Sequence, residues 1–177
     1  MVRRVATAGA LVCALMPVFS VTASAGTASA GKVVPWNTLA RNANVVCLGY
    51  DKKLFKLPGL AALQNLKSEK DLTPEIMKNS MVPYLTGELA LEQEMLRKWS
   101  ALGTPKEHVY RVAWARWLTL WKTVHVPAAE SMLASAKRND RKGMAAAEAS
   151  LKAHDAEGNK LEKKTLAFAV CQWDTAS

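Results

Sequence analysis

The sequence has few of the residues that build β-sheets and none of the motifs that mark common enzymes. Beyond residue 31, alternating runs rich in Val, Ile and Thr are missing, whereas the helix formers Ala, Leu, Lys, Glu and Met are plentiful. Gly-x-Ser-x-Gly, phosphate-binding glycine loops and His-Glu-x-x-His are absent. Cys-x-x-Cys-His is also absent, which excludes covalent c-type haem. We therefore predict an all-α protein that is not an enzyme, with no catalytic residues and no cofactor.

Long hydrophobic runs are confined to the N-terminus. After the basic pair Arg3 and Arg4, residues 5–21 are almost continuously apolar, and small residues follow up to Ala25. This pattern is typical of a secretory signal peptide, and the run is too short for a comfortable transmembrane helix. We predict a signal peptide over residues 1–25, with cleavage after Ala30 as the alternative, and a secreted or extracytoplasmic location.

Cysteine is scarce, with three in the whole chain. Cys13 lies inside the predicted signal peptide, so the mature chain would keep Cys47 and Cys171. In an oxidising compartment an even pair of cysteines favours a disulfide, here one that ties the first helix to the last. Such a bridge would stabilise the fold by roughly 4 to 5 kcal/mol in the chain-entropy model. Two separate buried thiols are the alternative.

Acidic residues are outnumbered by basic ones. The formal net charge is +9, and removal of Arg3 and Arg4 with the signal peptide leaves +7. An excess of this size attracts anionic surfaces, although the basic residues are scattered as on an ordinary solvated surface. No nucleic-acid-binding motif is present, so nucleic acid is not an expected partner. The partner stays open, with an envelope surface or another exported protein as the kinds considered, and no transmembrane segment is expected after signal removal.

The helical pattern predicts a single bundle domain over residues 37–174, preceded by a flexible leader at 26–36. Consecutive helices joined by short loops favour an antiparallel up-and-down bundle of four to five helices. Pro83 and Pro127 fall inside two of these helices, where each proline either kinks the helix or breaks it. The predicted helices begin near Asn37 or Thr38, near Leu60, after the cap Thr73, at Pro105 and after the cap Asp140, and the last ends near Trp173.

The most strongly marked helix is predicted from Pro105 to about Arg138. Thr104 precedes a proline and is followed three residues later by Glu107, which predicts a capping box. Aromatic and apolar residues then recur at helical spacing on one face. A stripe of this kind is more often part of a core than the lining of a groove. Its members are Tyr110, Trp114, Trp117, Trp121 and Val124.

Two helices place carboxylates among apolar side chains. Glu88 and Glu92 fall on the apolar arc of the second long helix. A buried carboxylate must be paired, protonated or bound to a metal, so a ligand or metal site inside the bundle is one hypothesis. The Glu-x-x-His pair is missing, which argues against a metal site. Either glutamate could instead pair with Arg116 or a lysine, and the last helix could bury its Ala-rich face rather than its polar residues. The candidate residues are Glu88, Glu92, His125, His154, Asp155 and Glu162.

The order of several short motifs resembles that of a group of small exported bacterial helical proteins. The resemblance covers about residues 40–173, although this chain is richer in Trp and Met. It implies a helical bundle and a bridge between Cys47 and Cys171. The group has no characterised activity, so the resemblance implies no function. Its motifs here are Ala43-Asn44-Val45-Val46-Cys47 with Tyr50, Leu57-Pro58, Glu88-Leu89, Leu96, Leu102, Thr104-Pro105, Tyr110, Trp114 and Cys171.

Two functions are compatible with these observations. The leading hypothesis is a secreted, non-catalytic binding or structural module of the cell envelope or medium, with its ligand unknown. The alternative is a metal- or cofactor-binding carrier bundle that uses inward-facing carboxylates. The two differ in whether the polar residues of the last helix turn inward, which the helical pattern alone leaves open.

Overall fold

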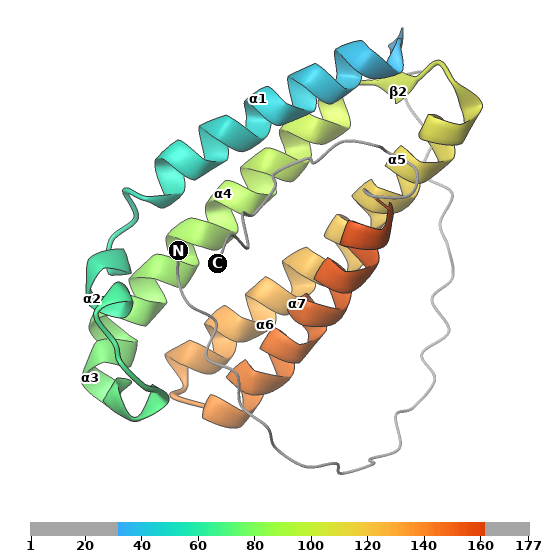
Figure 1. The fold of residues 1–177 in the computed structure, drawn as a ribbon. Coiled ribbons are helices and arrows are strands. Elements are labelled where there is room, and N and C mark those ends of the chain that lie inside the picture. The colour runs from blue at the N-terminus through green and yellow to red at the C-terminus, as the bar shows by residue number, and fades with distance from the viewer. Residues whose placement is uncertain (1–31, 162–177) are drawn as a thin grey trace, which may run out of the picture.

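The described part of this computed structural model covers residues 32–161 and is all-α apart from two strands of two residues each. Four long helical segments run alternately in opposite directions, so the predicted antiparallel bundle is confirmed (Figure 1). The predicted signal peptide lies outside the described residues, as do Glu162, Cys171 and the end of the last helix. The pairing of Cys47 with Cys171 therefore stays a prediction.

The long segments are joined by short connections at the two ends of the bundle. The first segment is α1 (Trp36–Leu54), followed by α2 (Leu60–Gln64) and the 3-10 turn η1 (Glu69–Asp71). The second consists of α3 (Pro74–Ile76), η2 (Met77–Met81) and α4 (Val82–Ala101). The third consists of α5 (His108–Leu120), η3 (Trp121–His125) and α6 (Val126–Lys137), and the fourth is α7 (Arg141–Leu161).

Neither internal proline breaks its helix. A proline in a helix removes one N–H donor and its ring crowds the carbonyl four residues earlier. In both segments a π-helical turn comes before the proline, η2 before Pro83 and η3 before Pro127. The residue preceding each proline donates to the carbonyl five positions earlier, Val82 to Met77 and Val126 to Trp121. The wider turn relieves the crowding, and the helix continues on the other side.

The predicted capping box at Thr104 is wrong. Thr104 and Pro105 form strand β2, which pairs in parallel with β1 (Val33–Val34), and α5 begins only at His108. The carboxylate of Glu107 instead accepts a hydrogen bond from the backbone N–H of Trp36 at 3.0 Å, at the start of α1. The local sequence predicts a helix start at Thr104, but the backbone of Thr104 is used in the strand pairing instead.

Other predicted helix ends are confirmed. The hydroxyl of Thr73 accepts the N–H of Ile76 at 3.2 Å, with Pro74 in the first helical turn. The carboxylate of Asp140 accepts the N–H of Gly143 at 2.9 Å at the start of α7. Gly103 has φ +103° just after α4, a conformation that a side chain would strain.

The N-terminal end of the described chain belongs to the fold. Val33 pairs with Thr104 and Val34 with Pro105, and the side chain of Val34 is buried. Trp36 is also buried and stacks on Tyr110, with ring centroids 4.8 Å apart. Residues 33–36, assigned to a flexible leader from the sequence, are therefore part of the ordered domain.

Tryptophans fill the core between α1, α4 and α5, as predicted for the stripe. Trp114, Trp117 and Trp121 are buried, and the ring of Trp99 from α4 lies 4.4 Å from that of Trp117 and 5.0 Å from that of Trp121. Edge-to-face pairs of this kind add about 0.5–1.5 kcal/mol each to the burial of the rings. Tyr110 and Val124, the remaining members of the stripe, are partly buried.

Candidate functional site: a buried histidine and carboxylate cluster

Three helical segments bring polar side chains into the interior of the bundle. Glu92 comes from α4, His125 from the last residue of η3, and His154 and Asp155 from α7. The relative exposures of the side chains of Glu92 and His125 are 8% and 11%, and that of His154 is 4%. Asp155 is the most accessible of the four, at 25%. The cluster is therefore enclosed on the glutamate side and opens toward the aspartate.

Short contacts link the four side chains in a row. Oε1 of Glu92 lies 2.9 Å from Nε2 of His125, and Nδ1 of His125 lies 3.2 Å from Nδ1 of His154. Nδ1 of His154 lies 3.4 Å from Oδ1 of Asp155. A carboxylate beside Nε2 of His125 accepts a hydrogen bond from the N–H at that nitrogen. In this tautomer the other ring nitrogen, Nδ1, carries a lone pair. The lone pair is directed at the second histidine.

The cluster contains two buried polar atoms that have no hydrogen-bond partner in the described part of the chain: Oε2 of Glu92 and Nε2 of His154. A buried polar atom left without a partner costs about 1–3 kcal/mol. A group of residues that tolerates two such atoms is not explained by packing alone. Buried polar atoms without partners are therefore a reason to look for a ligand at this site.

The tryptophan core continues directly into the cluster. The ring of Trp121 lies 3.9 Å from the ring of His125 and 5.4 Å from that of His154, measured between centroids. Trp121 and His125 are the first and last residues of the π-helical turn η3. Single π-helical turns occur often at functional sites. Here the turn places the imidazole beneath the indole at the border between the apolar and the polar interior.

A second polar group lies next to Glu92 on α4 and α1. The hydroxyl of Tyr84 donates to Oε1 of Glu88 at 3.0 Å. The pKa of Glu88 is raised to about 7, chiefly by burial and to a lesser degree by the charge of Glu92, while the hydrogen bond from Tyr84 acts to lower it. Burial and the same two carboxylates also raise the pKa of Tyr50 on α1. Glu88 thus holds a proton over much of the acidic range, which limits the negative charge beside Glu92.

The row of nitrogens and oxygens has the composition and spacing of a metal site. His125, His154 and Asp155 each offer one ligand atom, and these three atoms lie within 4.8 Å of one another. Imidazole nitrogens suit zinc, copper, iron and nickel, whereas calcium and magnesium prefer oxygen ligands. Glu92 then orients His125 from the other side of its ring, as carboxylates commonly do for metal-bound histidines. The arrangement can hold a divalent transition-metal ion.

The structure brings most of the predicted site residues together. Glu92, His125, His154 and Asp155 form the cluster, and Glu88 lies beside it without contacting the histidines in the described structure. Glu162 lies outside the described residues. The Ala-rich face of α7 is exposed at Ala145, Ala149, Ala153 and Ala156, whereas His154 is buried and Asp155 is partly buried.

Two details differ from the sequence-based alternatives. Arg116, considered as a partner for Glu88 or Glu92, instead pairs with Glu157 on α7. Tyr50 and Tyr84 were not among the predicted site residues, yet both contribute to the polar interior. The spacing of four residues between Tyr84 and Glu88 on one helix face was the available signal, because such residues are neighbours.

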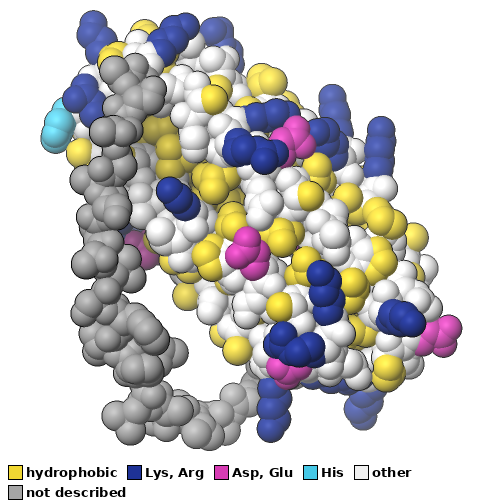
Figure 2. All heavy atoms as spheres, turned by 180° about the vertical axis from the view of Figure 1, so that it is seen from behind, with side chains coloured by type: hydrophobic (Ala, Val, Ile, Leu, Met, Phe, Trp, Pro, Cys, Tyr) yellow, Lys and Arg dark blue, Asp and Glu magenta, His cyan; other side chains and the backbone are white. Residues whose placement is uncertain are grey.

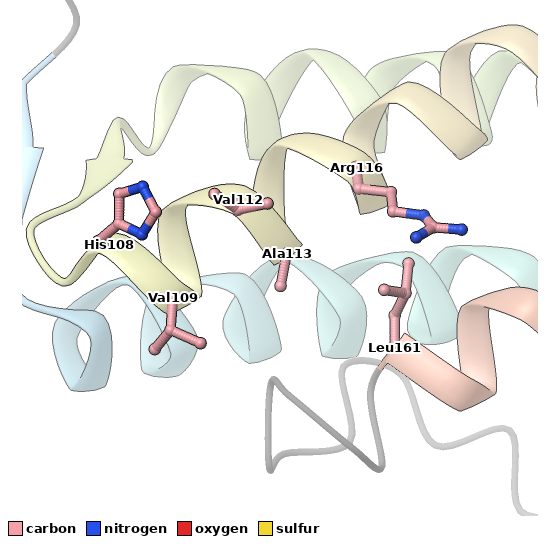
Figure 3. Close-up of a pocket in the computed structure, with 6 residues that line it drawn as sticks. All are labelled: His108, Val109, Val112, Ala113, Arg116 and Leu161. Carbon is pink, nitrogen blue, oxygen red and sulfur yellow. The ribbon is translucent and has the colours of Figure 1, made fainter.

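A separate groove runs along the outer side of α5 and is mostly apolar. Val109 and Val112 lie along it, with His108 near one end and Arg116 near the other, and Leu161 of α7 faces it (Figure 3). Few polar groups point into this groove to orient a small ligand. It also shares no residue with the histidine cluster, which makes the cluster the better candidate for a specific site.

The face of the molecule drawn in Figure 2 carries many basic side chains without a single dominant patch. Figure 2 shows Lys and Arg side chains spread from one end of the bundle to the other, with apolar side chains between them. Several basic residues have acidic partners, for example Lys53 and Lys98 with Glu94. None of the described helices has the length and apolarity to cross a membrane.

Comparisons with known proteins give no relative on which to base an assignment. No family model matches the chain, and no curated protein or solved structure matches it significantly. The class defined by fold and site is an all-α bundle with a buried histidine and carboxylate cluster, and its function must be argued from that cluster.

Proposed function

We propose that this protein is an exported, non-catalytic binding bundle whose ligand is a divalent transition-metal ion. His125, His154 and Asp155 would hold the ion, and Glu92 would position His125. The observation that carries the proposal is the contact of 3.2 Å between the two Nδ1 atoms, with Oδ1 of Asp155 3.4 Å from the second of them. The sequence left two functions open, a binding module and a metal-binding carrier. The present proposal joins them, because it names a metal ion as the ligand of the binding module.

Electrostatics favours a cation at this position. Glu92 and Asp155 place two carboxylates around two histidines in an interior where isolated charge is expensive. Among residues 32–161, the side chain that contacts Glu92 is His125, and no lysine or arginine pairs with it. A divalent ion would balance both carboxylates while using the lone pairs of the imidazoles. The donor set of two imidazoles and a carboxylate therefore suits a divalent cation.

Zinc titration of the mature, metal-free protein tests this proposal. We expect one ion per chain by isothermal titration calorimetry and native mass spectrometry. His154→Ala should weaken zinc binding by more than about 100-fold, because loss of a residue that merely orients a ligand already costs 10–100-fold. His108→Ala is the control, since this histidine at the start of α5 is exposed, lies outside the cluster and should leave the affinity unchanged. Equal zinc binding by both variants would refute the assignment.

The predicted disulfide fits the same extracytoplasmic setting. Cys47 is 3% exposed, and Leu161, the last described residue, packs against the cluster that contains it. Cys171 follows ten residues later, and an extended chain covers up to about 3.3 Å per residue, so Cys171 is within reach. We propose that Cys47 and Cys171 form a bridge in the exported protein. The burial of Cys47 in the first helix supports this pairing.

Intact mass spectrometry of protein exported by a bacterial host decides the disulfide and the export together. The mature mass identifies cleavage after Ala25 or after Ala30. A bridge shows as a mass two hydrogens lower than that of the reduced chain, and alkylation without reductant should label neither Cys47 nor Cys171. Two alkylated thiols in the unreduced, unfolded protein would show separate cysteines instead.

A further inference from the structure

The first helix of the bundle carries apolar residues on two opposite sides. The side that faces the core consists of Trp36, Leu39, Ala43, Cys47 and Tyr50, all of them buried. A second line of residues recurs at the same spacing of three and four on the solvent side. We call it the outer stripe of α1, and its members are Arg41, Val45, Leu48, Lys52, Phe55 and Lys56. Packing of the bundle explains the first side and leaves the outer stripe without a role.

The apolar members of the outer stripe are largely exposed to solvent. Val45 is 63% exposed, Leu48 60% and Phe55 63%, and they are three of the six exposed large hydrophobic side chains among residues 32–161. Phe55 follows the last residue of α1 and keeps its helical course, since its N–H donates to the carbonyl of Asp51 at 3.3 Å. Exposed apolar residues that lie singly are ordinary, whereas a line of them along one helix indicates a contact surface.

The charged members of the outer stripe are all basic. Arg41 precedes the first two apolar residues, Lys52 lies between Leu48 and Phe55, and Lys56 ends the stripe. In the described part of the chain none of these three cations forms an ion pair with an acidic side chain. The stripe therefore presents positive charge and apolar side chains together.

The position of α1 in the bundle decides which partner fits this surface. The helix lies along one edge of the bundle with α4 on its inner side, so the outer stripe forms a ridge (Figure 1). Asp51, the one acidic residue of α1, lies beside the stripe and is partly buried. Helices with basic and apolar residues on one face lie in the headgroup region of a bilayer, with the apolar side chains inserted and the cations beside lipid phosphates.

We infer that the outer stripe of α1 binds the surface of an anionic phospholipid bilayer. Val45, Leu48 and Phe55 enter the headgroup region, and the three cations contact the phosphates. The contact is about 22 Å long, because an α-helix rises 1.5 Å per residue. A lipid surface adapts to a ridge, whereas a protein partner needs a groove of matching shape. The histidine cluster contains no residue of α1, so this binding is independent of the proposed metal site.

Flotation of the mature, exported protein with lipid vesicles tests the inference. The signal peptide has to be removed, because its apolar run would itself bind lipid. We expect the protein to float with vesicles of phosphatidylglycerol and phosphatidylcholine in equal parts, and to stay behind with vesicles of phosphatidylcholine alone. Added salt should weaken the binding, since it screens exposed charges. Equal binding to both kinds of vesicle, or to neither, would overturn the inference.

Substitutions on the ridge identify the surface that binds. The double variant Leu48→Ser with Phe55→Ser should lower the partition coefficient by about tenfold or more, because two apolar side chains leave the contact. Lys52→Gln should lower it about fivefold through the loss of one cation near an anionic surface. Val109→Ser with Val112→Ser is the matched control, since these valines of α5 are 56% and 55% exposed and should leave the binding unchanged.

The outcomes distinguish the partner and the surface from the proposed metal function. Equal losses in the two double variants would overturn the assignment to α1. Capture by immobilised polyglutamate that is lost in Lys52→Gln, without any vesicle binding, would overturn the lipid partner in favour of an acidic protein. All variants should keep their helical circular dichroism and their zinc affinity, so a loss of lipid binding reports on the ridge and leaves the metal site intact.

Discussion

The two π-helical turns of this bundle have the same cause and different surroundings. η2 comes before Pro83 and η3 before Pro127, and in each the residue preceding the proline donates to the carbonyl five positions earlier. In η2 the buried side chain is Met77, which belongs to the second apolar cluster together with several leucines and Tyr84. In η3 the buried side chains include His125, which contacts Glu92 and His154. In both turns the proline determines the backbone geometry. The buried side chain of the turn then determines whether the turn belongs to the apolar core or to the candidate site.

The largest expected effects come from truncating the buried residue of each turn. His125→Ala should weaken zinc binding by more than about 100-fold, because it removes both a ligand and the link to Glu92. Met77→Ala should lower the free energy of unfolding by about 2–5 kcal/mol through the cavity it leaves. Zinc titration and urea denaturation of both variants distinguish the two roles. A loss of zinc binding in folded Met77→Ala would contradict the separation of core and site.

A smaller effect is expected when the cause of each turn is removed. Pro127→Ala restores a backbone N–H and allows η3 to close as an ordinary α-helix, which moves His125 relative to His154. We expect zinc affinity to fall by about 10–100-fold, as for other changes in the positioning of a ligand. Pro83→Ala changes η2 in the same way and should leave the zinc affinity unchanged. Equal effects of the two substitutions on zinc affinity would show that the turn does not position the histidine.

The carboxylate beside the site should make stability depend on pH. Burial raises the pKa of Glu88 from 4.5 to about 7, so the folded state binds a proton that the unfolded state has released. The stabilisation is complete below pH 4.5 and is lost as the pH rises through 7, by up to about 3 kcal/mol. Denaturation of metal-free protein should show this slope, and Glu88→Gln should remove it.

Tyr84→Phe should change the pH dependence of stability in the direction opposite to Glu88→Gln. The hydrogen bond from Tyr84 lowers the pKa of Glu88, so its loss should extend the decline of stability to higher pH. A flat profile in the wild-type protein would show that Glu88 is hydrated rather than buried. An unchanged slope in Glu88→Gln would assign the effect to another group, such as Asp51, whose pKa is also raised by burial.

The smallest effect concerns the helix start before η2. Thr73→Ala removes a hydroxyl that accepts the N–H of Ile76 and should cost about 1 kcal/mol of stability. Thr104→Ala removes a threonine with a similar sequence context that begins no helix, and should stay within about 0.5 kcal/mol. Chemical denaturation of the two variants measures the difference. Equal losses would indicate that Thr104 contributes in a way that the strand pairing does not explain.

The threonine pair also shows how far sequence reasoning reaches. The two Thr-Pro segments look alike, but only Thr73 is free to cap, because Thr104 is held by β1, about seventy residues away in the chain. Periodicity predicted the helices and the tryptophan core, since both depend on local spacing. The strand at Val33 and the capping of α1 by Glu107 depend on contacts distant in sequence, which the local pattern does not contain.

The site was predictable in its members and not in its geometry. Carboxylates on apolar arcs made Glu92 and Asp155 candidates for inward-facing residues, although the Ala-rich face left the orientation of the last helix open, and both are at least partly buried. The meeting of His125 with His154 depends on the π-helical turn and on how α7 packs against η3 and α6. Sequence spacing gives neither the turn nor the register between helices, so the contact between the imidazoles could not be derived from it.

The closeness of Trp121 to the cluster gives the protein a built-in optical signal. An indole whose ring lies 3.9 Å from an imidazole emits less strongly when that imidazole gains a proton or a nearby positive charge. Occupancy of the cluster should therefore be visible as a change in intrinsic fluorescence, without any added dye. The chain has six tryptophans, and Trp121→Phe would identify the part of the emission that comes from this one. Ion exchange at the site could then be followed in real time on the unlabelled protein.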